Sequence, residues 1–160
     1  MKKYELTDTT ITFQGRTLHQ IRYLMDVGYN IKAGNLGGWV ETEKNLSQRG
    51  NAVVCDNAKV YGNAMVCDNA EVYGNAVVSG NAKISKLYDL LVIGPIGSRH
   101  SFTSFYRSQD EKILVSCGCF HGDISAFRNK VCETHMDHPK HLAAYLNAAD
   151  FAEKLIEGRA

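Results

Sequence analysis

Residues 50–85 repeat one six-residue phrase without a break, as GNAVVC, DNAKVY, GNAMVC, DNAEVY, GNAVVS and GNAKIS. A branched apolar residue recurs at every sixth position, and an alanine stands two residues before each of them. The apolar residues are Val54, Val60, Val66, Val72, Val78 and Ile84, and the alanines are Ala52, Ala58, Ala64, Ala70, Ala76 and Ala82. This period is not helical. Residues two apart share one side of a strand, so each alanine and the apolar residue after it should face inward together.

The Gly-Asn and Asp-Asn pairs fall between these short strands, where a turn needs residues that tolerate positive φ. A strand and a turn that recur every six residues are typical of a parallel β-helix with triangular coils, in which three hexads make one coil. Residues eighteen apart should then stack, for example Tyr61 on Ser79. Repeat arrays need about three units and capped ends for a stable core. The two coils encoded here are therefore too few to stand alone.

The repeat resembles the hexapeptide-repeat left-handed β-helix family, in the phage and bacterial type written as repeated "GNARVYGNA" phrases. Similar segments of phage proteins also cover residues outside the repeat. These are AGNLGGWVE at residues 33–41, NLS at 45–47, IGPIGSR at 93–99, FYR at 105–107 and CGCF at 117–120. The resemblance implies a left-handed winding and a phage-type C-terminal domain, but no function comes with the fold.

We therefore predict a mainly β protein with a short left-handed parallel β-helix over residues 50–85. An N-terminal β-hairpin and the segment leading into the repeat, residues 1–49, would cap one end. A small α+β domain over residues 86–160 would follow the other end. The predicted elements outside the repeat are strands at 10–13, 17–24, 88–93, 102–107 and 112–120, a helix from Asp123 to Glu133, and a second helix from Pro139 to Gly158.

Composition restricts the classes of protein that fit this sequence. The formal net charge of +1 over 160 residues argues against bulk electrostatic binding of nucleic acid, which needs a basic face. No long apolar run is present and no hydrophobic leader follows Met1, so we expect no membrane partner and a cytoplasmic location. The five cysteines are odd in number, which argues against a disulfide framework.

The first candidate site is the glycine-punctuated loop from Gly94 to His100. Backbone N–H groups in such loops can face an anion, and arginine binds phosphate or carboxylate through two parallel hydrogen bonds. The following strand adds a second charge and a flat ring. The predicted ligand-binding residues are Gly97, Ser98, Arg99, His100, Tyr106 and Arg107. The alternative interpretation is an ordinary loop between two strands.

A second candidate is a group of cysteine and histidine residues, namely Cys117, Cys119, His121, Cys132 and His135. These residue types bind zinc, but their spacing does not match the common zinc motifs. Cys119 and His135 could also act as a nucleophile and a base. We predict no metal, no cofactor and no catalytic residue here. Acyltransferases that resemble this repeat use a histidine between subunits, and the repeat has none, so an acetyltransferase is disfavoured.

Outward apolar residues of the repeat predict self-association, and a homotrimer is the usual assembly of the family that the repeat resembles. These residues are Val53, Tyr61, Met65, Tyr73 and Val77. The leading hypothesis is a non-enzymatic, phage-derived homotrimer that binds a nucleotide-like anionic molecule, with capture of a host antiviral signalling nucleotide as its use. Two alternatives stay open. One is a structural oligomerisation module that docks on a host or phage protein, and the other is an enzyme that acts on a phosphate-bearing small molecule.

Overall fold

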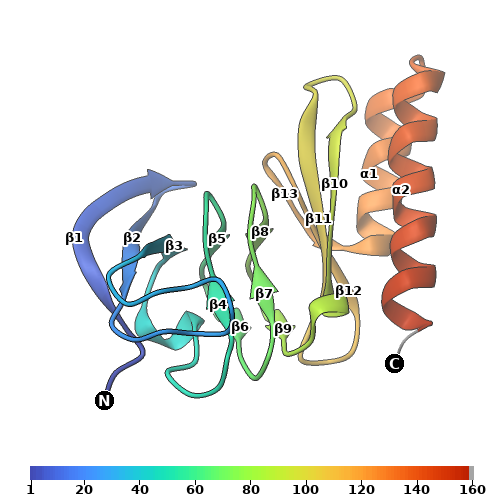
Figure 1. The fold of residues 1–160 in the computed structure, drawn as a ribbon. Helices are drawn as coiled ribbons and strands as arrows, with labels where there is room; N and C mark the ends of the chain where they lie inside the picture. Colours follow the sequence, from blue (N-terminus) through green and yellow to red (C-terminus); the bar gives the residue numbers. More distant parts are fainter. Residues whose placement is uncertain (159–160) are drawn as a thin grey trace.

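The computed structural model describes residues 1–158, which form thirteen strands and two α-helices (Figure 1). The elements are β1 (Tyr4–Phe13), β2 (Arg16–Tyr23), β3 (Leu36–Val40), β4 (Val53–Val54), β5 (Lys59–Val60), β6 (Met65–Val66), β7 (Glu71–Val72), β8 (Val77–Val78), β9 (Lys83–Ile84), β10 (Leu90–Ile96), β11 (Ser101–Arg107), β12 (Ile113–Cys117), β13 (Phe120–Asp123), α1 (Ile124–His135) and α2 (Pro139–Glu157). Two short 3-10 helices span Glu43–Asn45 and Leu87–Asp89. No helix within the described residues is both long enough and apolar enough to cross a membrane.

The structure corrects the predicted fold class. Residues 1–158 form a mixed α/β protein, mainly β, with a five-stranded sheet, a four-stranded sheet, two two-stranded sheets and two helices, and they form no solenoid. Each hexad supplies a strand of only two residues, and each strand pairs with a single other hexad. A continuous array needs more stacked repeats than this. One pair, β5 and β8, is instead incorporated into the sheet of the N-terminal hairpin, in the order β1-β2-β3-β5-β8.

Within the repeat, the local predictions from the period of six are confirmed. The strands pair in parallel at an offset of eighteen residues, as in Lys59 with Val77 and Met65 with Lys83. The alanine and branched apolar residue of every hexad are at most 1% exposed. Asp56 and Asp68 have φ of 56°, and Gly74 has φ of 65° at the equivalent turn position, so these turns do need residues that tolerate positive φ.

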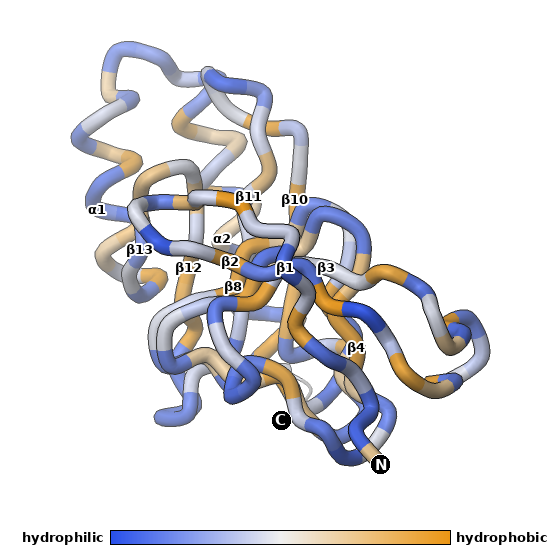
Figure 2. The backbone as a smooth tube through the Cα atoms, turned by 90° about the vertical axis from the view of Figure 1, so that its left-hand side faces the viewer, coloured by the Kyte–Doolittle hydropathy of each residue, from blue (hydrophilic) through white to orange (hydrophobic). Residues whose placement is uncertain are grey.

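The N-terminal segment closes one end of the repeat core. Tyr23 is fully buried, and its hydroxyl donates to the Val54 carbonyl at 3.0 Å and accepts from the Val54 N–H at 2.9 Å. Gly37 in β3 lets the strands approach this closely, since a Cβ there would lie 2.6 Å from Ile21 Cγ1 and 2.7 Å from the Val54 carbonyl oxygen. The loop of residues 24–35 stands out from the body of the protein in front of the repeat (Figures 1 and 2).

The antiparallel sheet β10–β13 lies between the repeat and the two helices (Figure 1). Adjacent residues of β11 point to opposite faces of this sheet. Tyr106 belongs to the apolar core of the repeat, and Phe105 belongs to the core under α1 and α2. The predicted helices are confirmed, and Asp123 caps α1 by accepting from the Ala126 N–H at 2.8 Å. The single strand predicted over residues 112–120 is wrong, because a turn at residues 118–119 separates β12 from β13.

Candidate functional site

A cavity of about 400 Å³ opens on the helix side of the sheet, between the turn after β10, the turn between β12 and β13, and the two helices. We call it the Arg99 cavity. Ser98 and Arg99 come from the first turn, Gly118 from the second, Lys130 from α1 and Tyr145 from α2. Residues from four separate parts of the C-terminal half thus meet at one hollow.

Gly97 shapes one wall of the Arg99 cavity. Its φ is +73°, and a Cβ at this position would overlap the hydroxyl and ring of Tyr145. Glycine therefore lets the Tyr145 ring lie directly against the turn. That ring stacks on His135 with the centroids 5.3 Å apart, and it meets the buried Phe127 edge-on at 5.9 Å. The wall is consequently flat and aromatic.

The walls of the Arg99 cavity carry positive charge. Arg99 and Lys130 lie on different walls, and the residues that line the cavity include no aspartate or glutamate. Within residues 1–158 Arg99 makes no ion pair, whereas Lys130 Nζ lies 3.7 Å from an exposed Glu133 carboxylate oxygen. Exposed ion pairs of this kind are weak, so the Lys130 ammonium group can leave Glu133 and bind another anion.

Two groups in the cavity have shifted pKa values that favour their neutral forms. Burial lowers the pKa of His135, and the nearby His141 and His138 lower it further. Burial raises the pKa of Tyr145, and Cys117 beside it adds to the shift. At neutral pH both side chains therefore offer N–H or O–H donors without adding negative charge. Thr134 and Ser101 add hydroxyl groups to the same walls.

The structure brings together only part of the predicted ligand-binding set. Ser98 and Arg99 line the cavity and Gly97 shapes it, whereas His100 is exposed and lies outside the lining. Tyr106 and Arg107 lie at the opposite end of β11 from this turn.

Tyr106 and Arg107 make contacts inside the protein and do not line the Arg99 cavity. The Tyr106 side chain is buried, and its hydroxyl lies 2.7 Å from Ser116 Oγ. Arg107 pairs with Asp89 at 3.2 Å and donates to the carbonyl of Ile156. Strand alternation places Tyr106 on the repeat side of the sheet, away from the helices.

Sequence reasoning missed the helical contributions to the cavity. Tyr145, Lys130 and Thr134 carry no signal in the sequence, because helices contain many such residues at packed and exposed positions. Lys130 and Thr134 are four apart and so share one side of α1. Their role as cavity residues becomes visible only in the folded structure, where α1 lies beside the turn of Arg99.

The predicted cysteine and histidine group is divided by the structure. Cys117, Cys119 and His135 line the Arg99 cavity, Cys132 is exposed, and His121 lies on another part of the sheet. Among residues 1–158 no three His, Cys, Asp or Glu side chains are grouped so that they could hold a metal ion. No hydrogen bond joins Cys119 to His135 within the same residues, so the nucleophile and base arrangement has no support.

His121 joins three parts of the chain. Gln14, at the tip of the β1–β2 hairpin, donates through Nε2 to the Gly118 carbonyl at 2.9 Å. The other amide atom, Gln14 Oε1, therefore faces His121 Nε2 at 2.7 Å, and that nitrogen must carry the proton. His121 Nδ1 is then the acceptor for Ser116 Oγ at 3.0 Å. This network connects the hairpin to the turn that forms one wall of the Arg99 cavity.

We expect the free energy of unfolding to fall as the pH drops below 6.5, the pKa of an unperturbed histidine. Burial lowers the pKa of His121, so the unfolded chain takes up the proton more readily than the folded chain. Denaturant unfolding at a series of pH values should show a shallower slope for His121→Gln than for the wild type. The pKa of His135 is lowered as well, so His135→Gln is measured alongside to separate its contribution to the slope from that of His121. An unchanged slope in His121→Gln would contradict this assignment.

Most of the outward residues behind the predicted homotrimer are covered by the chain itself. Val53 and Tyr61 are 7% and 5% exposed, and Val77 is half-buried against β11, where its N–H donates to Ser104 Oγ at 3.0 Å. Met65 and Tyr73 remain exposed. The homotrimer stays a prediction, with a smaller apolar surface to support it.

Comparison of the chain with family models finds no match, and comparison with curated proteins finds none either.

Proposed function

We propose that this protein binds a small nucleotide-like anion in the Arg99 cavity and leaves it chemically unchanged. One observation supports this proposal above the others. A cavity of about 400 Å³ carries two cations, several hydroxyl groups and aromatic walls, and no aspartate or glutamate among residues 1–158 lines it. Its volume falls in the range of about 300–1,000 Å³ that is typical of small-molecule sites.

Each part of such a ligand has a matching group in the cavity. Arg99 can bind a phosphate through two parallel hydrogen bonds, and Lys130 can add a second positive charge from α1. The stacked pair of Tyr145 and His135 offers a flat wall for a planar base. Ser98 and Thr134 offer hydroxyl groups for a sugar.

The biological setting that we propose rests on the sequence resemblance. In this setting the protein is phage-encoded, stays in the host cytoplasm and retains a host antiviral signalling nucleotide. A protein with this role needs tight binding and no turnover.

A second candidate function is a protein-contact module. It is favoured by the exposed apolar side chains on the repeat side of the sheet, among them Tyr73 and Leu87, each 59% exposed. Apolar side chains that gather on one surface often mark a protein interface.

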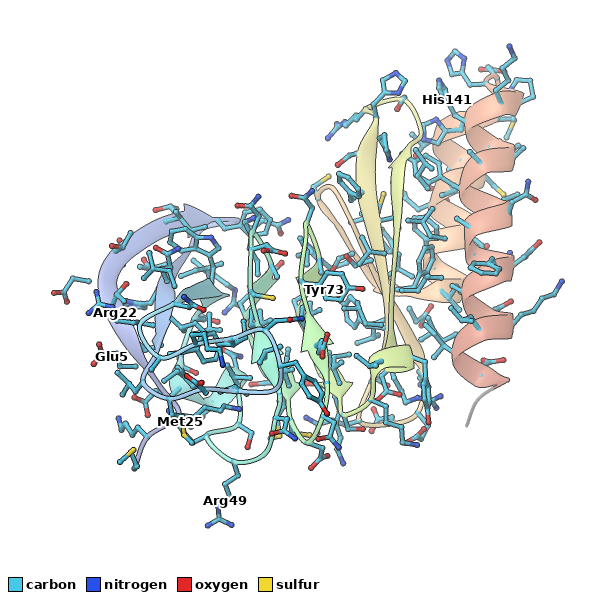
Figure 3. All side chains as sticks on the ribbon, in the orientation of Figure 1. Glu5, Arg22, Met25, Arg49, Tyr73 and His141 are labelled. Carbon is cyan, nitrogen blue, oxygen red and sulfur yellow. The ribbon has the colours of Figure 1, made fainter. Side chains whose placement is uncertain are left out.

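The test is to incubate the protein with cyclic and ADP-ribose-type nucleotides, remove unbound ligand, and recover the bound fraction after heat denaturation. We expect at least one nucleotide to be retained intact. Arg99→Ala should weaken binding by roughly 10- to 100-fold, because it removes charge-assisted hydrogen bonds of about 1.5–3 kcal/mol. Arg49→Ala is the matched control, since Arg49 projects from the lower edge of the molecule, away from the helices (Figure 3).

Each result of this experiment separates the candidates. Recovery of a chemically altered nucleotide would favour the enzyme, and no retention by the wild type would leave the protein-contact module. Equal affinity of Arg99→Ala and the wild type would remove the Arg99 cavity from the proposal.

A further inference from the structure

Three histidines gather at the corner where α1 ends and α2 begins. His135 is the last residue of α1, His138 immediately precedes α2, and His141 lies in the first turn of α2. The His141 ring lies 5.9 Å from the His135 ring and 6.1 Å from the His138 ring, measured between centroids. Figure 3 shows His141 at this end of α2, opposite to the C-terminus. We call the three residues the histidine cluster.

The histidine cluster reaches the Arg99 cavity through one of its members. His135 lines the cavity, and its ring stacks on Tyr145 with an angle of 26° between the two planes. His138 and His141 are not among the lining residues. A positive charge on His135 would therefore act on a ligand directly, whereas charges on the other two would act from just outside the cavity.

The groups of the chain that surround His135 disfavour its protonated form. Burial lowers the pKa of His135 from 6.5, repulsion from His141 and His138 adds to the shift, and no carboxylate of residues 1–158 contributes to it. Glu133, two residues earlier on α1, is exposed and lies against Lys130. The other titratable groups that line the cavity come from the turn after β10, from the end of β12 and its turn, from α1 and from α2, and they are Arg99, Cys117, Cys119, Lys130 and Tyr145. Two of them are cations, so a proton on His135 meets positive charge on several sides.

A bound anion would reverse this balance. A phosphate held by Arg99 and Lys130 brings negative charge beside the His135 ring, and an opposite charge at close range favours the protonated form of a histidine. His135 also ends α1, where the helix dipole favours a positive charge. Both ring nitrogens of a protonated histidine are donors, so His135 can then give the phosphate a charge-assisted hydrogen bond.

We propose that the Arg99 cavity takes up a proton on His135 together with its anionic ligand, so that acid strengthens binding. This inference rests on the proposed function, because it concerns the same ligand. Coupling between two binding events is reciprocal, so an anion that raises the pKa of His135 is itself bound more tightly, by the same factor, when His135 is protonated. The affinity should therefore rise as the pH falls through the pKa of His135 in the complex, and it should level off below the lower pKa of the free protein.

Nucleotide affinity of the full chain, measured at about pH 5.5 and about pH 8, tests the proposal. The probes are ADP-ribose and 3′,5′-cyclic AMP, which carry no phosphate monoester, the group whose second pKa of about 6 would itself titrate in this range. We expect at least one probe to bind the wild type about five-fold or more tightly at the lower pH. His135→Gln should remove most of this difference. His100→Gln is the matched control and should keep it, because His100 follows Arg99 in the chain but is exposed and does not line the cavity.

Calorimetry in two buffers of different ionisation enthalpy gives a second measurement, which needs no variant. Binding of the probe to the wild type near pH 6.5 should be accompanied by net proton uptake. Equal affinity at both pH values, binding without proton uptake, or a His135→Gln variant with the full pH dependence would each overturn this inference and leave the proposed function in place. Failure of both probes to bind at either pH would count against the proposed function itself, and this inference would fall with it. If His135→Gln does not fold, the proton uptake of the wild type decides.

Discussion

Replacing Gly37 by alanine is expected to destabilise the protein by at least about 3 kcal/mol, the upper part of the range for overpacked cores. The added Cβ would lie 2.6 Å from Ile21 Cγ1, 2.7 Å from the Val54 carbonyl oxygen and 2.8 Å from Tyr23 Cε2. The Ile21 and Tyr23 side chains are fully buried, and the Val54 oxygen belongs to the backbone, so none of these three groups can move aside without a large loss of stability. Denaturant unfolding followed by circular dichroism measures the loss.

Gly74→Asn is the matched control for this prediction. Gly74 has φ of +65° and no atom within 4 Å of an added Cβ, and asparagine tolerates this backbone conformation. Its unfolding midpoint should stay close to that of the wild type. Equal midpoints for Gly37→Ala and Gly74→Asn would show that β3 can separate from the repeat at no cost.

Arg107→Met is expected to lower the free energy of unfolding by about 3–5 kcal/mol, as is usual when one member of a buried ion pair is removed. The Asp89 side chain is 3% exposed, and Arg107 Nε lies 3.2 Å from it. The same carboxylate accepts from the N–H groups of Ser85 and Lys86, each at 2.9 Å, so it cannot turn towards water without breaking the turn after the last hexad. Unfolding by urea at neutral pH measures the effect.

Two further variants separate the buried pair from its exposed neighbour. Glu111 is the second partner of Arg107, and its side chain is 75% exposed. Glu111→Gln should therefore lower the free energy of unfolding by less than about 1 kcal/mol. Adding Asp89→Asn to Arg107→Met should recover part of the lost stability, because no uncompensated buried charge remains. A larger loss in Glu111→Gln than in Arg107→Met would reverse this assignment.

The sequence predicted the interior of the repeat correctly because the information there is local. A period of six fixes which residues face inward, and Ala58 and Val60 are both fully buried as expected. The fold class was wrong because it depends on what the hexads pair with beyond their own neighbours. Trp39 and Val40 of β3 pair with Lys59 and Val60, so an antiparallel hairpin and a repeat strand share one sheet. The period of the repeat does not indicate that β5 pairs with β3.

The candidate site was predicted only where its chemistry is contiguous in the chain. Ser98 and Arg99 stand in one glycine-punctuated turn, and both line the cavity. Lys130 and Tyr145 reach the same cavity from two helices, and only the packed structure reveals their proximity. Arg107 pairs with Asp89, which lies eighteen residues upstream at the point where the repeat ends, and the sequence does not show that these two side chains meet. A buried cation and a ligand-binding cation look alike until the partner is placed.

The contacts of Gln14 join the N-terminal hairpin to the C-terminal half of this chain. The base of the β1–β2 hairpin is anchored by Tyr4, whose hydroxyl donates to the Leu46 carbonyl at 2.7 Å, and its tip bonds to Gly118, 104 residues away in the chain. The hairpin thus acts as a strut that spans the repeat from outside. The position of the hairpin therefore depends on contacts at both of its ends, one beside the repeat and one at the turn that lines the Arg99 cavity.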